Sequence, residues 1–490
     1  MGGMNLGYWP KELLPNLETS TGIDFGGGVY TPNNEASPPM GNGHFPQEGI
    51  GKACYFMEAQ FIGEDQKPFT PGPDWPAHSA QNADDKYYQI LGENPVSGVW
   101  DVAYGGPGRN IPLTEEEDLE LEKELQSLNK PPIKTLKSFT GDLFDCIEMY
   151  KQPAFDHPAL KNHKLQIRPS FQTKNNVTMD ENFKSLLLDP GFNDTCPPGT
   201  VIIRRTRKEE LIMAKELPKY FRNYDSKYHV LDSSGKNYFA IMQSSIYRLA
   251  PHRFHGFQSK LTTWALPNVG PDQASANQIW MYGDIDVPHE SQNVIQTGWH
   301  VLPRLYNDTF TRFFTFFTID GYKTGCMNLN CKGFIQVSAT HGPGFAFTGT
   351  DLSTYKGKQA YFDFQILKDP KSGNWWLAMG GINLGYWPKE LLPRFDKSSA
   401  VDLGGSVYTP NNKASPPMGN GHFPQEGIGR ACYFMRAQFI GTDQKPFTPG
   451  LDWAYPAKNA DDKYYQISGD PRYRGDWDIA YGGPGGLVPG

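Results

Sequence analysis

The sequence predicts an all-β fold, an antiparallel β-sandwich of two sheets, preceded by a segment of mixed structure that carries one short helix. Three observations lead there. Gly and Pro supply 52 and 41 of the 490 residues, and aromatic residues make up 13%. So many helix breakers disfavour long helices, and so many aromatic residues disfavour disorder. Short runs rich in Thr, Phe and Trp fill the second half, and only one clear helical pattern occurs.

The predicted strands lie after about residue 236. They include residues 309–318, 334–338, 361–366 and 374–378, which are rich in β-branched and aromatic side chains. Turn residues such as those at 372–374 separate them. Short strands at this spacing are typical of an antiparallel sandwich.

The predicted helix covers residues 114–128. Thr114 can cap its first turn, with Glu117 as the reciprocal partner of a capping box. Two prolines at 131 and 132 end it. One face carries the leucines 121, 125 and 128.

The charge and hydropathy of the chain exclude two classes of partner. The net charge is −7 and the pI is near 5.9, which argues against nucleic acid. No apolar run approaches the roughly 20 residues that span a membrane. Residues 1–5 contain neither the charged nor the apolar part of a secretory signal, so we expect that this start is not the natural one.

An internal repeat organises the chain. Residues 1–108 recur almost continuously as residues 379–485; for example, M-G-N-G-H-F-P occurs at 40–46 and again at 418–424. The stretch between the copies has no counterpart. We therefore expect residues 1–110 to be a partial duplicate of the C-terminal half of a domain, left by tandem duplication or by a gene model that starts inside an upstream copy.

The sequence lacks the common catalytic and metal-binding motifs. There is no G-x-S-x-G, no H-E-x-x-H and no P-loop, so we expect neither a metal nor a cofactor. Cys326 and Cys331 lack two further ligands nearby, and a short disulfide is the better interpretation. If the chain is secreted, sequons allow glycosylation of Asn176, Asn193 and Asn307.

Several longer runs carry a family resemblance. They are residues 136–164, C-P-P-G-T-V-I-I-R-R-T at 196–206, N-V-I-Q-T-G-W at 293–299, Y-K-T-G-C-M-N-L at 322–329 and L-G-Y-W-P at 384–388. Through them, residues 111–485 resemble the plant neprosin family of secreted glutamic peptidases. The resemblance implies an activation peptide over residues 111–235 and a sandwich-type catalytic domain over 236–490. It also implies an acid-activated proenzyme that cleaves next to proline.

The family's chemistry requires two facing glutamates, and this chain has replaced both. Of two like charges that share a site, one keeps its proton, so one group can activate water while the other polarises the scissile carbonyl. The first family position is Gln296. The second is Ser406, and the N-terminal copy has Gly28 there. Neither Gln nor Ser titrates, so the leading hypothesis is a pseudo-peptidase.

Two alternatives remain open at this point. A neighbouring carboxylate such as Glu390 would leave an active acid endopeptidase. The second alternative is a β-sandwich that binds carbohydrate or cell wall through surface aromatic residues. For the pseudo-peptidase, Trp299 and Trp387 would offer flat faces to the rings of a proline-rich polypeptide in the substrate groove.

The resemblance adds expectations about cysteines, location and assembly. We expect a Cys146–Cys196 bridge, whereas Cys432 and Cys54 lack the family's usual partner and are expected to be buried thiols. The location is expected to be extracellular or vacuolar. The surplus half-domain would remain unpaired, or would swap into a second chain to give a dimer.

Overall fold

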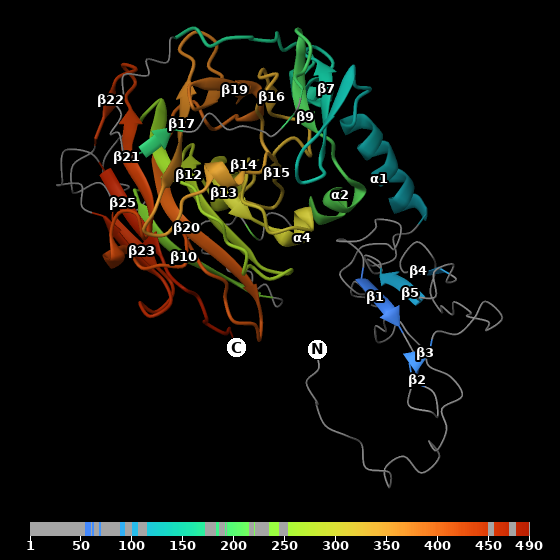
Figure 1. Cartoon of the computed structure of the whole chain (residues 1–490). Helices are drawn as coiled ribbons and strands as arrows, with labels where there is room; N and C mark the ends of the chain where they lie inside the picture. Colours follow the sequence, from blue (N-terminus) through green and yellow to red (C-terminus); the bar gives the residue numbers. More distant parts are fainter. Residues whose placement is uncertain are drawn as a thin grey trace. The chain divides into compact units, whose positions relative to one another are not determined.

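The computed structural model describes residues 118–171, 192, 194–213, 220, 235–244, 253–448, 455–469 and 477–489 in full (Figure 1). Outside these ranges it describes only the backbone of strands and of helix ends. The chain divides into two compact units, Met1–Leu119 and Glu120–Gly490, and each is treated by itself.

A seven-stranded antiparallel sheet forms one layer of the second unit. Its central strands β13, β12 and β20 are buried on both faces, which explains their continuous runs of apolar and small side chains. The order is β15 (Cys326–Met327), β14 (Arg312–Thr318), β13 (Val294–Val301), β12 (Ala274–Tyr282), β20 (Ala400–Pro410), β10 (Gly235–Gln243) and β23 (Tyr455–Lys458).

A ten-stranded sheet forms the other layer. Its main path runs β16 (Ile335–Gln336), β19 (Ile382–Trp387), β18 (Trp375–Met379), β17 (Gln359–Lys368), β11 (Gly256–Thr262), β21 (Cys432–Ile440), β25 (Trp477–Gly482) and β24 (Gln466–Gly469). Strand β22 (Pro446–Phe447) extends β21, and β8 (Phe183–Ser185) pairs with β17 in parallel.

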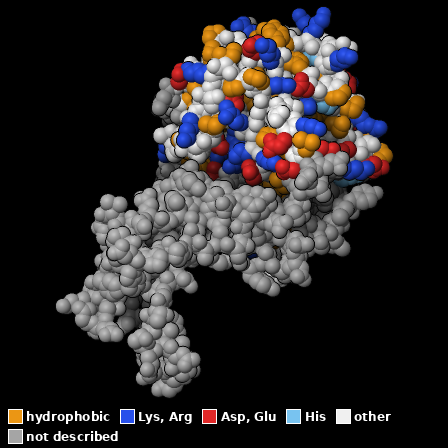
Figure 2. Space-filling view, turned by 90° about the vertical axis from the view of Figure 1, so that its right-hand side faces the viewer, with side chains coloured by type: hydrophobic (Ala, Val, Ile, Leu, Met, Phe, Trp, Pro, Cys, Tyr) orange, Lys and Arg blue, Asp and Glu red, His pale blue; other side chains and the backbone are white. Residues whose placement is uncertain are grey.

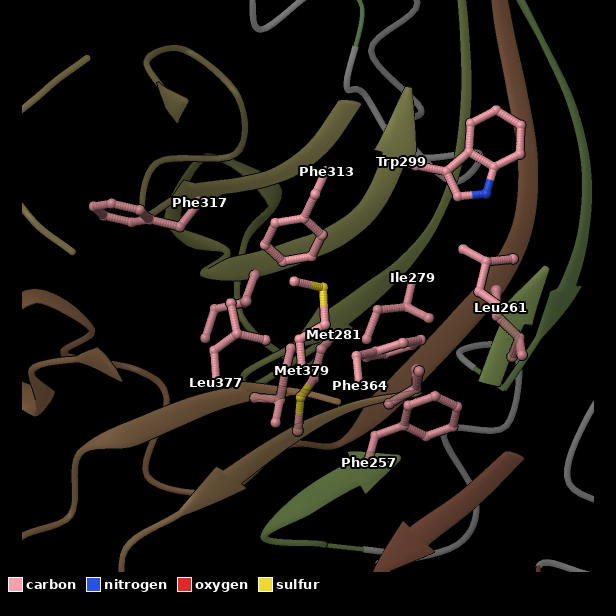
Figure 3. Packing of buried hydrophobic residues seen from close by; sticks show 14 of the residues in the cluster. Phe257, Leu261, Ile279, Met281, Trp299, Phe313, Phe317, Phe364, Leu377 and Met379 are labelled. Atoms are coloured by element: carbon pink, nitrogen blue, oxygen red, sulfur yellow. The ribbon is translucent and has the colours of Figure 1, made fainter. Parts of the chain in front are cut away.

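The core lies between these two sheets. Ile279 and Met281 face it from the seven-stranded sheet, and Leu261, Phe364 and Leu377 face it from the ten-stranded sheet (Figure 3). The predicted antiparallel β-sandwich is therefore confirmed. The predicted strands at 309–318, 361–366 and 374–378 are β14, β17 and β18, whereas only Ile335–Gln336 of 334–338 pairs as a strand.

Short helices connect the strands of the two sheets. Helix α4 (Pro303–Tyr306) follows β13 and ends at Asn307, whose left-handed backbone closes it. The single-turn helices are η5 (His289–Ser291), η6 (Gly349–Asp351), η7 (Lys389–Leu391) and η8 (Pro424–Glu426).

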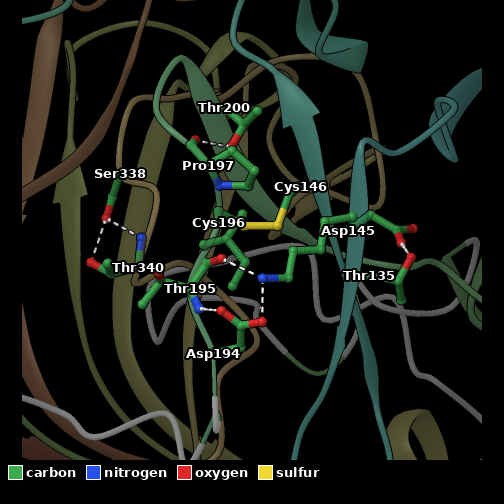
Figure 4. Close-up of a disulfide and its surroundings, with 12 residues drawn as sticks. Thr135, Asp145, Cys146, Asp194, Thr195, Cys196, Pro197, Thr200, Ser338 and Thr340 are labelled. Carbon is green, nitrogen blue, oxygen red and sulfur yellow. Dashed lines mark hydrogen bonds and ion pairs between the residues drawn. A yellow bond between two sulfur atoms is a disulfide. The ribbon is translucent and has the colours of Figure 1, made fainter.

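Residues 120–213, here called the lead segment, precede the sandwich. Helix α1 (Glu115–Leu128) occupies the predicted range; the proposed cap at Thr114 lies outside the described residues. A three-stranded sheet follows, in the order β6 (Lys134–Lys137), β7 (Leu143–Glu148) and β9 (Thr200–Arg204). The Cys146–Cys196 disulfide closes this sheet onto the chain that leads into β9 (Figure 4). The segment also contains η3 (Pro153–Asp156), η4 (Pro158–Leu160) and most of α2 (Lys208–Ala214).

The described backbone of the first unit repeats a pattern seen in the second. Strand β1 (Cys54–Ala59) pairs with β5 (Trp100–Gly105), which pairs with β4 (Gln89–Glu93), and β2 (Phe61–Ile62) pairs with β3 (Pro68–Phe69). Cys54 lies opposite Tyr104 just as Cys432 lies opposite Tyr481. Whereas β21 also pairs with β11, β1 has no second neighbour on its other side within the described part of its unit.

The surface of the second unit is mixed in charge. On the face shown in Figure 2, basic and acidic side chains alternate with apolar and uncharged ones. In the part of the chain that the structure describes, no helix has the length and apolar character needed to cross a membrane.

Candidate functional site

Gln296 lies on β13 and points away from the core between the sheets. We call this side of the seven-stranded sheet its outer face. The Gln296 side chain is 0% exposed, and its Nε2 donates a hydrogen bond of 2.8 Å to the Tyr322 hydroxyl. Burial raises the pKa of Tyr322 well above its ordinary value. At Gln296 the outer face therefore carries two neutral polar groups bonded to each other.

Ser406 lies on β20 and faces the same side. Its Oγ accepts a hydrogen bond of 3.2 Å from Gln278 Nε2, and Ser406 is 2% exposed. Gln278 Oε1 accepts no hydrogen bond within the described residues. Ser406 shares a cross-strand row with Ala276 and His300. The His300 ring is turned elsewhere, since it stacks on Phe314 at 4.4 Å.

His300 does not supply an acid or base in this arrangement. Burial, together with the nearby Arg312, lowers its pKa to about 3. Its Nε2 lies 3.2 Å from the hydroxyl of Tyr306, whose pKa burial raises to about 12. Both groups are therefore neutral over the physiological range.

The two family positions share the outer face but do not lie opposite each other. Gln296 pairs across to Trp280, and Trp280 pairs across to Asp402. Ser406 comes four residues later on β20, which is about 13 Å along an extended strand. The carboxylate that shares a row with Gln296 is therefore Asp402, with Trp280 between them.

Asp402 is a buried carboxylate that sequence reasoning did not select. It is 1% exposed, and it accepts hydrogen bonds from the Tyr282 hydroxyl at 3.1 Å and from the Ser244 backbone N–H at 2.9 Å. The available signal was its position four residues before Ser406, on the same face of a strand that carries no other charged residue. It is the carboxylate nearest in register to Gln296 among the residues paired on this sheet.

The two tryptophans assigned to the groove are core residues instead. Trp299 is three residues from Gln296, and an odd spacing on a strand places it on the opposite face. Its Nε1 donates a hydrogen bond of 2.8 Å to the Thr262 carbonyl inside the core. Trp387, on the ten-stranded sheet, packs edge-to-face on Phe334 with 4.9 Å between ring centres. Both are 0% exposed, and this part of the prediction is wrong.

Glu390, the alternative carboxylate, does not lie on the outer face. It belongs to η7, and its Oε2 lies 3.3 Å from His163 Nδ1. The two line a surface pocket of about 380 Å³ between the lead segment and the loops of the ten-stranded sheet. His163 also forms a hydrogen bond of 3.0 Å with the Tyr386 hydroxyl.

The segment before the sandwich reaches the outer face. Tyr220 packs edge-to-face on Tyr408 of β20, with 4.6 Å between ring centres, and Met213 joins the same apolar cluster. Two described residues that precede β10 therefore pack against this face. Gly28, the equivalent position of the N-terminal copy, lies outside the described residues.

The cysteines and sequons are distributed as follows. Cys326 is bonded to Cys331, and Cys146 to Cys196, as expected from the sequence. Cys432 is a buried thiol whose pKa burial raises to about 11, whereas the side chain of Cys54 is not described. Asn307 is exposed at the end of α4, and Asn176 and Asn193 fall outside the described residues. No group of His, Cys, Asp or Glu among the described residues could hold a metal ion.

Comparison with known proteins gives two family matches. The Neprosin model matches residues 1–107 and 271–484, and the Neprosin activation peptide model matches residues 135–243. Among solved structures, the chain is similar to scytalido-glutamic peptidase bound to a peptide-based transition-state analog. It is similar also to SCP-B, a member of the Eqolisin family, in complex with the tripeptide Ala-Ile-His. Each match has a TM-score of 0.25 and 9% identity, and covers 51% of this chain and 98% of the other. With the Neprosin model covering well over half of its residues, this chain belongs to the neprosin family.

Proposed function

We propose that this chain is a secreted plant member of the neprosin family that binds polypeptides without cleaving them. One observation carries the proposal. The two positions that match the family's glutamates hold Gln296 and Ser406, and each is engaged by a neutral partner. Peptide hydrolysis by this route requires one group that accepts a proton from water and one that donates, and neither residue titrates.

The ligand we propose is an extended, proline-rich polypeptide. Trp299 and Trp387 are in the core, whereas Trp280, Phe316 and Tyr408 are among the aromatic side chains of the outer face, where they are buried in the intact chain. Flat aromatic rings bury proline rings well and leave the backbone free to bond polar groups. Gln278 Oε1, which accepts no described hydrogen bond, could accept from a backbone N–H of such a ligand.

Access to this face requires a displacement. Tyr220 covers Tyr408 in the structure, so an external polypeptide has to replace the stretch that carries Tyr220. Binding is therefore expected to be stronger after the chain is cut between Tyr220 and Gly235 than in the intact chain.

The deciding experiment incubates the cut and intact proteins with a proline-rich peptide from acid to neutral pH. Mass spectrometry follows cleavage and fluorescence anisotropy follows binding. We expect binding by the cut form and intact peptide throughout. Hydrolysis by the purified wild-type chain would contradict the proposal, and so would a cut form that binds no peptide.

A second candidate function has a specific observation in its favour. Gln296 and Asp402 occupy one row, which gives an amide and a carboxylate on one face. In an acid peptidase, Asp402 would take a proton from water, the water oxygen would attack the carbonyl carbon, and Gln296 Nε2 would donate to the oxyanion. The proton would then pass to the leaving amine as the C–N bond breaks.

The first candidate is preferred because the indole of Trp280 stands between those two groups. Asp402 already accepts hydrogen bonds from Tyr282 and Ser244. Should hydrolysis be found, Asp402→Asn abolishes it under the second candidate, whereas Glu390→Gln leaves it unchanged.

A further inference from the structure

The lead segment shares one continuous apolar cluster with the sandwich. Five of its side chains belong to the cluster that also holds the core residues between the two sheets, and all are at least nine-tenths buried. Removal of these groups would therefore expose part of a close-packed cluster. They are Ile147, Ala154, Leu160, Val201 and Ile203.

Backbone bonding continues across the same boundary. The Gln152 side chain bonds both polar backbone groups of Gln336, accepting from its N–H at 2.8 Å and donating to its carbonyl at 3.0 Å. The Ile202 N–H donates to the Ser338 carbonyl at 3.2 Å. Gln336 lies on β16, the last strand at one end of the ten-stranded sheet. The lead segment therefore satisfies an edge that would otherwise present unpaired polar groups.

A buried ion network crosses the boundary as well. Arg312 of β14, 1% exposed, donates to Asp142 of the lead segment at 2.6 Å. Arg204 of the lead segment also bonds Asp142, at 2.7 Å, and donates to Glu210. Departure of the segment would remove Asp142 from Arg312 and leave Asp308 as its remaining carboxylate partner. Breaking one ion pair of a buried guanidinium in this way is costly.

A strand inside the matched activation-peptide region belongs to the sandwich. The match runs to residue 243, and β10 (Gly235–Gln243) lies between β20 and β23 of the seven-stranded sheet. That part of the region cannot leave without breaking the sheet.

From these contacts we infer that the lead segment is a permanent part of the fold and stays bound after the chain is cut between Tyr220 and Gly235. Cutting then yields a two-fragment protein in which no described disulfide joins the fragments, because each of the two described bridges lies within one of them. This holds whether or not the chain cleaves peptides.

The test uses the full chain with two specific protease sites. One is inserted between Tyr220 and Gly235, and a second, different site between Gly108 and Glu115 removes the N-terminal unit. After both cuts, a non-reducing denaturing gel checks that no disulfide joins the fragments. Size-exclusion chromatography at neutral pH is expected to show the lead fragment co-eluting with the sandwich. Elution of the lead fragment alone, with the sandwich still folded by circular dichroism, would overturn the inference.

Matched variants test which contacts hold the fragments together. In the cut protein, Arg312→Met and Gln152→Ala should each release the lead fragment at a lower urea concentration than wild type. Gln152→Ala is included because its loss leaves no buried charge, so it should fold even where Arg312→Met does not. Lys413→Met, which removes an exposed ion pair with Asp272 on the sandwich, is the control and should leave the release unchanged. Equal release by all three variants would count against the inferred contacts.

Discussion

Gln296 and Asp402 lie in one cross-strand row of the seven-stranded sheet, with Trp280 between them. The family position at Ser406 is displaced from that row by four residues along β20. A carboxylate therefore remains on the outer face, although at a different place from the family's second glutamate. Because Asp402 is near, it will affect the pKa of any carboxyl group that is introduced at position 296.

Gln296→Glu should make stability depend on pH in a defined direction. The new carboxyl would be buried near Asp402, and both effects raise its pKa above the unfolded value of about 4.3. The folded state then prefers the protonated form. Stability is retained below that unfolded value and lost as pH rises through the folded pKa. Urea unfolding at pH 4 and pH 7 measures this, with the isosteric wild-type Gln as the reference. If the urea midpoint of the variant differs from that of wild type by the same amount at both pH values, the new carboxyl is more exposed to solvent than the structure indicates.

Asp369→Asn should weaken the attachment of the lead segment at neutral pH and have little effect in acid. Asp369 accepts hydrogen bonds from Gln166 Nε2 and from both the N–H and the hydroxyl of Ser170. Burial alone would raise its pKa, but these bonds and those from its own turn lower it overall. A lowered pKa means stabilisation that is present above the unfolded value of about 3.9 and lost as pH falls through the folded one.

The expected cost of Asp369→Asn is about 1–3 kcal/mol at pH 7, since charged hydrogen bonds are lost. Urea unfolding at pH 7 and pH 2.5 provides the comparison. Asp443→Asn, in the turn that follows β21, serves as a control for general loss of negative charge. A cost that is the same at both pH values would assign the effect to packing rather than to the carboxylate.

Removal of the two disulfides should have unequal effects. The Cys146–Cys196 bridge closes a separation of 50 residues and the Cys326–Cys331 bridge a separation of 5. On the chain-entropy model these loops are worth about 4 and about 2 kcal/mol. Paired Cys→Ala variants, compared by urea unfolding, should follow that order. Peptide mapping without reductant checks the bridges first, and the absence of a linked 146–196 peptide would contradict the first of them.

Leu403→Phe should destabilise the sandwich by about 1–3 kcal/mol through overpacking of the core. Leu403 is fully buried between the sheets, and the N-terminal copy has Phe25 at the equivalent position. The C-terminal copy therefore fits this core better. Ile428→Phe, at an exposed position, is the control and should be neutral. A neutral Leu403→Phe would show that the two copies are interchangeable at this site.

Deletion of residues 1–108 should leave the unfolding of the second unit unchanged. The chain divides into two compact units, and strands within residues 379–485 complete both sheets of the sandwich. Calorimetry of residues 111–490 and of the full chain gives the comparison, with limited proteolysis as a second measurement. A shifted transition, or a protease-resistant N-terminal unit in a monomer, would reveal a partner surface for that unit.

The strands and helix α1 could be predicted because they depend on local sequence pattern. The run at 309–318 and the leucine face of 121–128 carry their periodicity in the sequence itself. The side on which Trp299 lies was also within reach, since its odd spacing from Gln296 fixes the opposite face. That inference requires counting residues along the strand. The assignment of Trp299 to the groove rested on its aromatic character alone.

The role of Asp402 and the integration of the lead segment could not be read from local pattern. Asp402 shares a row with Gln296 only because β12 pairs with both β13 and β20, and this register joins residues more than 100 apart. The bonds of Gln152 to Gln336 span a separation of 184 residues. Such contacts follow from the topology of the sandwich, which the composition and periodicity do not specify.

The position of β20 has a consequence for the order of events during synthesis. This strand fills the gap between β10 and β12, yet it is made more than 100 residues after them. The N-terminal copy, which carries nearly the same sequence at residues 22–32, leaves the ribosome before either neighbour. For that interval a sequence that matches β20 is already made while β20 itself is not. The two copies of this sequence can therefore compete for the place between β10 and β12, and Leu403 against Phe25 is one of the differences between them.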